Sequence, residues 1–517
     1  MDQSFSRSLA TLEMDVRDEL ESVLNHEELL WKQKARCDWL NFGDRNTKFF
    51  HSRTIQRRKF NRILALKDNN GDWCSDQSTL SDEAVKFFEN MYGENPRPII
   101  DIPSNIFPCL KEQDIEFLNK PVLNDEIKKA LFDMALLKAP RSDGFHAHFF
   151  QSQWDLVGGT ICEWVQGIFA GNKIEEELNN TLLVLIPKKD RPKDFSQFRP
   201  ISLCSVMYKL VIKVIANRFK MVFPNFISPE QAGFIAGRNI SDNIIIAQEV
   251  IHTMRSKKTG RQWMAIKLDL EIDYDRTVGN SLKCPLSQLE SLRKSERIPY
   301  HFRDISWKVA THLVIEIGAE MDQAKLLKDI LRRSCDFSGH KISARKSNMF
   351  FSKNVDVNIS QLFGFQKVLN LGNYLGVPLL HDRVTKSTLD FVIGKVRNKL
   401  QNWDARKLSF AGRVTLAQSV LLAIPSYFMQ SLAIPKGVCE EIERIARQFI
   451  WGGSVDNPKS ALVSWDSICQ PRSHGGLGFR RLQDHNNSFL MKLCFNLFSR
   501  KDALWVRVLR SKYGWKS

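Results

Sequence analysis

Charged residues dominate the first 36 positions, and apolar side chains recur among them at every third or fourth position: Leu9, Leu12, Val16, Leu20 and Leu24. Positions with this spacing share one face of an α-helix. The pattern therefore predicts a long amphipathic helix at the start of the chain.

Short apolar runs predict strands elsewhere. TLLVLIPKKD at 181–190 is an aliphatic run that ends in a basic turn, and WMAIKL at 263–268 is a second strand-like run. The segment RILALKD is followed by Asn70 and Gly71 and then by Asp72 and Trp73. Asn-Gly is typical of two-residue hairpin turns, so we expect a β-hairpin here.

Helical patterns cover residues 120–180 and 202–223, and they dominate from about 385 to the end, where Leu, Trp and Phe are frequent. The glycine-rich segment HGGLGF at 474–479 interrupts them. Residues 276–320 have no clear period and resemble a junction between two pieces. The mixture of short strands and many helices predicts an α+β fold with a mostly helical C-terminal part.

The net charge of the chain indicates a class of partner. The chain has 75 Lys and Arg against 58 Asp and Glu, a formal net charge of +17. An excess of this size favours a polyanionic partner such as nucleic acid, although a basic soluble protein without such a partner is the simpler alternative. The 10 cysteines are scattered without a Cys-x-x-Cys pair, which predicts reduced thiols and no zinc site.

The chain has no apolar signal core in MDQSFSRSLATLEMDVRDEL and no stretch near the ~20 apolar residues that a membrane span needs. We therefore expect a soluble protein of the nucleus or cytoplasm, without a signal peptide, transmembrane segment or membrane partner.

Four carboxylates occupy alternate positions after WMAIKL: Asp269, Glu271, Asp273 and Asp275. Side chains alternate between the two faces of a strand, so all four would share one face. A carboxylate at a strand end is typical of Mg²⁺ sites for nucleotidyl transfer, but a solvated strand face is also consistent with the pattern. A calcium loop is excluded, because Tyr274 and Asn280 stand where the loop needs Gly and Glu.

The segment RNTKFFHSRTIQRRKFNR combines cations with aromatic residues. Cations contact phosphates and aromatic rings stack on unpaired bases, so single-stranded RNA is the expected partner. A solvated basic face over core phenylalanines is the alternative. The candidate nucleic-acid-binding residues are Arg45, Lys48, Phe49, Arg57, Arg58 and Lys59.

An ordered set of motifs extends this reading from about residue 25 to the end of the chain. It comprises LWKQKARCDWLNFGDRNTKFFH, LLKAPRSDGFHAHFFQSQWDLVG, LIPKKDRPKDFSQFRPISL, SPEQAGFIAGRNISDN, SGHKISARKSNMFFSKN, NYLGVPL, KLSFAGRVTLAQSVLLAIPSYFMQ and SWDSICQPRSHGGLGFRRL. Together these motifs resemble the reverse transcriptase of plant LINE-type (non-LTR) retrotransposons.

The resemblance implies a right-hand polymerase fold of fingers, palm and thumb. It also implies RNA-directed DNA polymerase activity with Mg²⁺, an RNA template and a DNA primer. Each matched position then takes a family role. Asp269 resembles the first metal-binding aspartate of the palm, and Lys346 a lysine near the leaving pyrophosphate.

Other matched positions resemble family sites that contact the nucleotide or the primer. Tyr274 resembles the aromatic gate against the 2′ position of the sugar, and Lys188 and Arg199 resemble the residues that face the triphosphate. Gln231 resembles a residue that supports template and nucleotide. Leu375 and Gly376 resemble the tip of the primer-grip hairpin.

The chain departs from the family after Arg276. CPLS at 284–287 follows almost at once, without the family's Gln-Gly pair, and the Asp-Asp pair that completes the metal site is missing. Glu316 and Glu320 are the candidate replacements. Arg141 stands where the family has Gly, which would be disruptive if that position needs a positive φ.

These observations predict a reverse transcriptase domain protein with a truncated palm, in which catalysis is impaired or lost. A non-catalytic nucleic-acid-binding protein and an inert product of a decayed element are the alternatives. The expected parts are a basic and aromatic linker region (1–110), fingers with the start of the palm (111–275), a palm remnant (276–384) and a helical thumb-like region (385–517).

Overall fold

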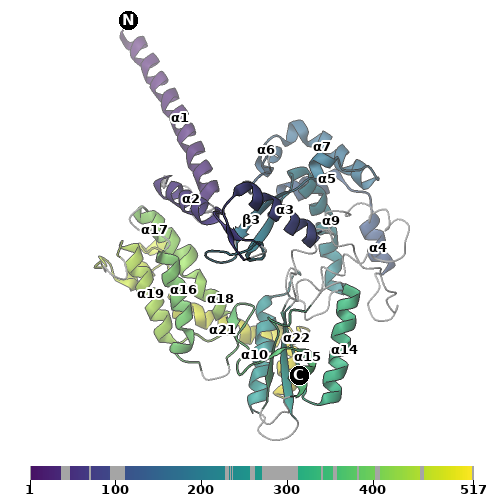
Figure 1. Cartoon of the computed structure of the whole chain (residues 1–517). Coiled ribbons are helices and arrows are strands. Elements are labelled where there is room, and N and C mark those ends of the chain that lie inside the picture. Colours follow the sequence, from purple (N-terminus) through teal and green to yellow (C-terminus); the bar gives the residue numbers. More distant parts are fainter. Residues whose placement is uncertain are drawn as a thin grey trace. The chain divides into compact units, whose positions relative to one another are not determined.

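The chain forms two compact units, which we describe separately (Figure 1). The first unit comprises Met1–Arg62 and Val384–Phe498, and the second comprises Ile63–Arg383 and Ser499–Ser517. The structure is a computed structural model. It describes residues 2–35, 47–68, 71–92, 111–141, 143–226, 232, 235, 237–256, 262–269, 312–338, 342–352, 358–380, 384–401, 408–453 and 459–514.

The first unit begins with two helices, α1 (Asp2–Ala35) and α2 (Thr47–Asn61), which pack on one another. α1 confirms the long helix predicted from the apolar spacing. Arg57 of α2 donates from Nη1 to the carbonyl of Ala35 (3.3 Å), so it satisfies one of the terminal carbonyls of α1.

The rest of the first unit is helical and confirms the predicted C-terminal pattern. Its helix α19 has a continuous apolar face that includes Val438, Ile442, Ile445 and Phe449, all buried. The elements are η2 (Ser387–Leu389), α16 (Asp390–Gln401), α17 (Phe410–Leu416), η4 (Ala417–Leu421), α18 (Ala423–Met429), α19 (Lys436–Ile450), α20 (Trp465–Ile468), η5 (Arg472–His474) and α21 (Leu482–Ser499).

The second unit has a helical part with its own core. Ile127 and Leu131 of α5, Val165 of α7 and Leu210 and Val214 of α9 are fully buried in it. The helices are α3 (Gln77–Tyr92), α4 (Glu112–Asn119), α5 (Asn124–Phe132), α6 (Ala147–Ser152), α7 (Trp154–Phe169), α8 (Glu176–Asn179), α9 (Val206–Phe226), α10 (Ile240–Ser256), α14 (Met321–Ser338), α15 (Asn358–Phe363) and α22 (Leu504–Lys512).

Two small hairpins of the second unit share a core. β1 (Leu66–Lys67) pairs with β2 (Trp73–Cys74), which confirms a hairpin here, and Asn70 of the predicted turn lies outside the described residues. β3 (Leu182–Pro187) pairs antiparallel with β4 (Phe198–Leu203), and η1 (Phe195–Gln197) precedes β4. Leu66, Leu80, Phe195 and Phe198 are buried together and join the two hairpins to α3.

The largest sheet of the second unit has the strand order β6-β5-β7-β8. Its strands are β5 (Trp263–Asp269), β6 (His312–Gly318), β7 (Asn348–Phe351) and β8 (Gln366–Lys367). β5 is antiparallel to both neighbours, and β7 is parallel to β8. Met264, Ile266 and Leu268 form a core with α14 and α15, so the other face of β5 carries Lys267 and Asp269.

Two interpretations of the sequence were wrong, one about where a helix begins and one about a region without a recognised element. The helix predicted over 202–223 begins at Val206, because residues 198–203 form strand β4. The region 276–320 contains a paired strand, β6, where no period was recognised. The described residues are mostly helical with small sheets, which is compatible with the predicted α+β class. None of the described helices is long and apolar enough to cross a membrane.

Candidate functional site

Asp269 is the last residue of β5, a strand with neighbours on both sides. Its backbone is fixed by a serine from a distant turn. The N–H of Asp269 donates to Ser347 Oγ (3.1 Å), and Ser347 Oγ donates to the carbonyl of Asp269 (3.4 Å). The Ser343 N–H also donates to that carbonyl (2.8 Å), so the strand end is held at both backbone polar groups.

The same turn carries Lys346, the second predicted catalytic residue. Ser343 accepts hydrogen bonds at its carbonyl from the N–H groups of Lys346 (3.2 Å) and Ser347 (2.9 Å). Ser343 and Ser347 are buried, whereas Lys346 is exposed. The structure therefore brings Lys346 and Asp269 onto directly bonded elements, although they are 77 positions apart.

Lys267 joins β5 to a second predicted element. Its Nζ donates to the carbonyls of Asn373 (2.7 Å) and Leu371 (3.3 Å), next to the hairpin of β9 (Asn373–Tyr374) and β10 (Val377–Pro378). Burial lowers the pKa of Lys267, and the charge of Asp269 on the same strand face opposes that shift. The sequence reasoning did not single out Lys267; a lysine inside an apolar strand run was the available signal.

Leu375 and Gly376 form the tip of this hairpin, as the resemblance implied. Both have positive φ, 49° and 81°, which is the conformation of a two-residue type I′ turn. Gln248 of α10 holds the far end of the hairpin: its Nε2 donates to the Leu380 carbonyl (2.8 Å), and its Oε1 accepts from the Leu380 N–H (2.9 Å). The hairpin is thus anchored to β5 and to α10.

The register of β5 and β6 places the candidate replacement acids away from Asp269. Asp269 pairs with His312, and Glu316 pairs with Ala265. Four residues of strand separate the two pairs, about 13 Å. Glu320 lies beyond the opposite end of the strand pair, because the preceding residue, Ala319, donates to the carbonyl of Gln262.

The residues that the structure describes do not make a two-metal site. Among them, no group of three or more His, Cys, Asp or Glu side chains is placed to hold a metal ion. Asp269 remains the candidate metal ligand from the described strands, and Glu271, Asp273 and Asp275 lie outside the described residues.

Lys188 and Arg199 lie together at one end of the β3–β4 hairpin. Arg199 pairs with Ile186, and the Lys188 N–H donates to the carbonyl of Gln197 (2.8 Å). Both side chains are exposed, and Lys188 Nζ donates to the carbonyl of Ser196 (2.9 Å). Two cations on neighbouring strand ends can bind a phosphate group, Arg as a fork and Lys as a point charge.

The N-terminal candidates divide by exposure. Lys48, Arg58 and Lys59 of α2 are exposed, and so is Phe60. Arg57 is half-buried, and Phe49 is buried at 4 % exposure, so its ring is unavailable for base stacking. The exposed side chains make α2 a basic surface with one exposed phenylalanine ring.

Three of the predicted site residues lie outside the described residues: Arg45, Gln231 and Tyr274. Arg141 is described and its φ is not positive, so the backbone strain that a Gly-to-Arg change could cause is absent at this position. Its guanidinium donates to the carbonyl of Glu177.

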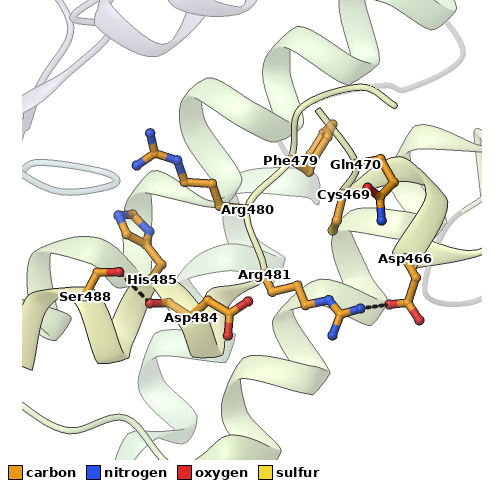
Figure 2. A pocket seen from close by; sticks show the side chains of 9 residues that line it. All are labelled: Asp466, Cys469, Gln470, Phe479, Arg480, Arg481, Asp484, His485 and Ser488. Carbon is orange, nitrogen blue, oxygen red and sulfur yellow. Dashed lines mark hydrogen bonds and ion pairs between the residues drawn. The ribbon is translucent and has the colours of Figure 1, made fainter. Parts of the chain in front are cut away.

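The first unit contains a polar cavity of about 420 Å³ that the sequence reasoning did not identify (Figure 2). It is lined by Asp466, Cys469, Gln470, Phe479, Arg480, Arg481, Asp484, His485 and Ser488. HGGLGF shapes one wall. A Cβ on Gly476 would lie 2.0 Å from the Gln470 carbonyl oxygen, so the loop needs glycine there.

The charges around this cavity are largely matched. Arg481 pairs with Asp466 (2.7 Å), and Glu443 accepts at Oε1 from the Leu482 N–H (2.5 Å). Burial lowers the pKa of His485, with a further contribution from Arg480, and burial raises the pKa of Cys469 to about 11. A thiol with that pKa is a poor nucleophile, so the cavity suits binding of a polar group rather than thiol chemistry.

Comparison with known proteins finds a family similarity in the part of the chain that contains the end of β3 and strands β4 and β5. Residues 186–281 match the family model described as reverse transcriptase (RNA-dependent DNA polymerase). The match spans Lys188, Arg199 and Asp269. The similarity to a reverse transcriptase domain thus falls on this part of the chain.

Relatives match this chain along longer stretches. The chain is 31% identical over 249 residues to an uncharacterized protein of transposon TX1 from Xenopus laevis, covering 47% of this chain and 19% of that protein. It is 33% identical over 137 residues, 26% of this chain and 22% of the relative, to a protein of Arabidopsis thaliana named as a ribonuclease H protein.

A third relative carries the retrotransposon name directly. The chain is 26% identical over 195 residues to a retrovirus-related Pol polyprotein from a type-1 retrotransposable element of Nasonia vitripennis. The match covers 38% of this chain and 17% of that polyprotein. The chain thus spans about a fifth of the length of each of these three relatives.

Proposed function

We propose that this chain derives from the reverse transcriptase of a plant LINE-type (non-LTR) retrotransposon, and that it binds RNA template and DNA primer with polymerase activity impaired or lost. The family match over 186–281 and the transposon names of the relatives support the ancestry. The net charge of +17 supports a nucleic-acid partner.

One observation carries the proposal of impaired catalysis: the residue paired with Asp269 on β6 is His312. Two-metal nucleotidyl transfer needs carboxylates from facing elements, with the ions ~4 Å apart. Glu316 is about 13 Å further along the sheet, too far to share an ion with Asp269. At this end of the sheet the described strands therefore provide one carboxylate, Asp269, whereas the two-metal reaction needs carboxylates on both facing elements.

The remaining roles follow as parts of the same proposal. Lys188 and Arg199 bind phosphate groups of a nucleotide, and Lys346 stands near the departing pyrophosphate. The Leu375–Gly376 tip contacts the primer. Gln231 and Tyr274 support and gate the nucleotide, and Mg²⁺ binds at Asp269 where it binds at all. The fingers, palm and thumb correspond to the residue ranges expected from the sequence.

Primer extension tests the catalytic part. The protein is incubated with an RNA template, a DNA primer and deoxynucleotides, in Mg²⁺ and separately in Mn²⁺, beside Asp269→Ala. We expect no extension above the Asp269→Ala background. Extension that disappears in the Ala variant would refute the loss of catalysis.

A non-catalytic nucleic-acid-binding protein is the second candidate, and the exposed cations of α2 favour it. It predicts RNA binding that weakens steeply with salt and that persists in Asp269→Ala. A folded preparation that neither binds RNA nor extends a primer would instead support the third alternative, in which the protein is the inert product of a decayed element.

A further inference from the structure

α1 presents two different faces to its surroundings. The face formed by Leu24, Glu28, Trp31 and Ala35 is buried or half-buried, and these residues recur with helical spacing. α2 packs on α1. The ring of His51 of α2 lies 4.6 Å from that of Trp31, which identifies this face as the one that α2 covers. The packing is therefore confined to the last turns of the helix.

A second apolar stripe on α1 stays exposed. Leu12, Val16, Leu20, Val23 and Leu30 are 46–59 % exposed. At 100° per residue they fall within about 80° of one another, and their mean direction is about 100° from the face that packs on α2. These five residues, here called the α1 stripe, thus form a separate apolar surface along the helix.

The helix that carries this stripe is acidic in a basic chain. Residues 11–30 contain seven carboxylates, and Arg17 is their one Lys or Arg. The acids Glu13, Glu19 and Glu27 stand within a turn of the stripe and are exposed. The remainder of the chain carries the surplus of positive charge, so α1 differs from it in sign.

We propose that the α1 stripe docks a basic amphipathic helix of another protein. The leucines and valines receive the apolar face of the partner, and its lysines or arginines pair with the carboxylates that flank the stripe. A second copy of α1 is disfavoured as the occupant, because two copies would set like charges against each other on both flanks. This site is independent of the proposed RNA binding.

Titration with synthetic helices of about 20 residues tests the proposal, a length at which isolated helices begin to be stable. Both probes carry leucines at helical spacing. One has lysines along the flanks and the other has glutamates at the same positions. Fluorescence anisotropy of the labelled peptide with the full chain gives the affinity, and circular dichroism of each peptide alone checks that both are comparably helical.

The decisive variant is Leu12→Ser/Val16→Ser/Leu20→Ser, and Met14→Ser is its matched control. Met14 is 66 % exposed on the opposite side of α1, so Met14→Ser removes an exposed apolar side chain without altering the α1 stripe. We expect the lysine peptide to bind, the triple variant to weaken it about tenfold or more, and Met14→Ser to leave it unchanged. Glu19→Lys/Glu27→Lys should weaken it as well.

Three outcomes would overturn the proposal. The glutamate peptide could bind as tightly as the lysine peptide, the triple variant could retain full affinity, or sedimentation could show self-association that the triple variant abolishes. The last result would identify a second copy as the occupant. RNA binding by the triple variant should equal that of the unchanged protein, which separates this site from the proposed function.

Discussion

The hydroxyl of Ser347 holds the backbone of Asp269 from both sides, accepting from its N–H at 3.1 Å and donating to its carbonyl at 3.4 Å. Ser347 is fully buried and lies 78 positions later in the chain. These two hydrogen bonds fix the end of β5 at Asp269, the candidate metal ligand. The position of the Asp269 carboxylate therefore depends on a distant serine.

Ser347→Ala should loosen this strand end. The change leaves the Asp269 N–H without its partner, which costs about 1–3 kcal/mol for a buried polar group. Hydrogen exchange of peptides that cover β5 should accelerate in the variant. Ser488→Ala is the matched control, because Ser488 bonds to the Asp484 carbonyl on an exposed helix face, and it should leave β5 exchange unchanged. Equal exchange in Ser347→Ala and the unchanged protein would contradict the expectation.

Leu375→Asn should stabilise the hairpin that the resemblance assigns to the primer. Leu375 has φ 49°, a conformation that costs a side chain with a Cβ about 1–2 kcal/mol, and Asn-Gly is the preferred pair for this turn. Exchange of the hairpin amides should slow by about fivefold. Leu375→Val should speed it, because β-branched residues tolerate positive φ least. Faster exchange in the Asn variant would mean that the packing of Leu375 outweighs the strain.

Local patterns in the sequence predicted the elements they belong to. The apolar spacing before Ala35 predicted α1, the run before Pro187 predicted β3, and the run before Asp269 predicted β5. β4 was missed because Pro200 argues against a strand; here the strand belongs to a two-stranded sheet, in which both strands are edges. β6 was missed although HLVIEIG carries a β-branched strand signal.

Contacts between distant segments could not be predicted from such patterns. Nothing in the turn near Ser347 indicates that it meets Asp269, and Lys267 gives no sign of the carbonyls it bonds. The family resemblance named Lys346 and the Leu375–Gly376 tip, and the structure joins both elements to β5 through backbone hydrogen bonds and Lys267. The exposure of the α1 stripe was equally hidden, because apolar spacing predicts a face without naming what covers it.

Arg218 should be essential to the helical core of the second unit. It is buried and forms a two-bond pair with Glu126, from Nε (2.8 Å) and Nη2 (2.9 Å). It also donates to the carbonyls of Leu118, Lys120 and Pro121. Arg218→Met should cost about 3–5 kcal/mol, because it leaves a carboxylate and three carbonyls without a donor.

The double variant Arg218→Met/Glu126→Met provides the control for this prediction. It removes both charges, so thermal unfolding should show a smaller loss than Arg218→Met alone. Equal losses in the single and double variants would mean that the carboxylate of Glu126 is not stranded when Arg218 is removed.

Neutralising the exposed cations of α2 should lower RNA affinity and its salt dependence. In Arg58→Gln/Lys59→Gln, the slope of log affinity against log salt should become less negative by about 0.7 for each lost phosphate contact. Arg17→Gln/Lys436→Gln removes two exposed cations from elsewhere and should leave the slope unchanged. Equal slopes in both double variants would place the RNA interface away from α2.

Protonation of Glu441 in acid should lower the free energy of unfolding of the first unit. Hydrogen bonds from Arg444, together with one from Arg397, lower the pKa of Glu441 from its ordinary value of 4.5 to about 2. A carboxylate whose pKa is lowered by folding stabilises the folded state above its unfolded pKa, and that contribution disappears as the pH falls through the folded pKa. The stabilisation should be complete above pH ~4.5 and lost by pH ~2.

The matched variant is Glu441→Gln, which keeps the shape of the side chain and removes its charge. Its melting temperature should lie below that of the unchanged protein at neutral pH. The difference should shrink as the pH falls from ~4.5 and vanish below ~2, because the carboxyl is then protonated in both folded and unfolded chains. A difference that stays constant across this window would show that the two arginines contribute to stability through contacts other than the charge of Glu441.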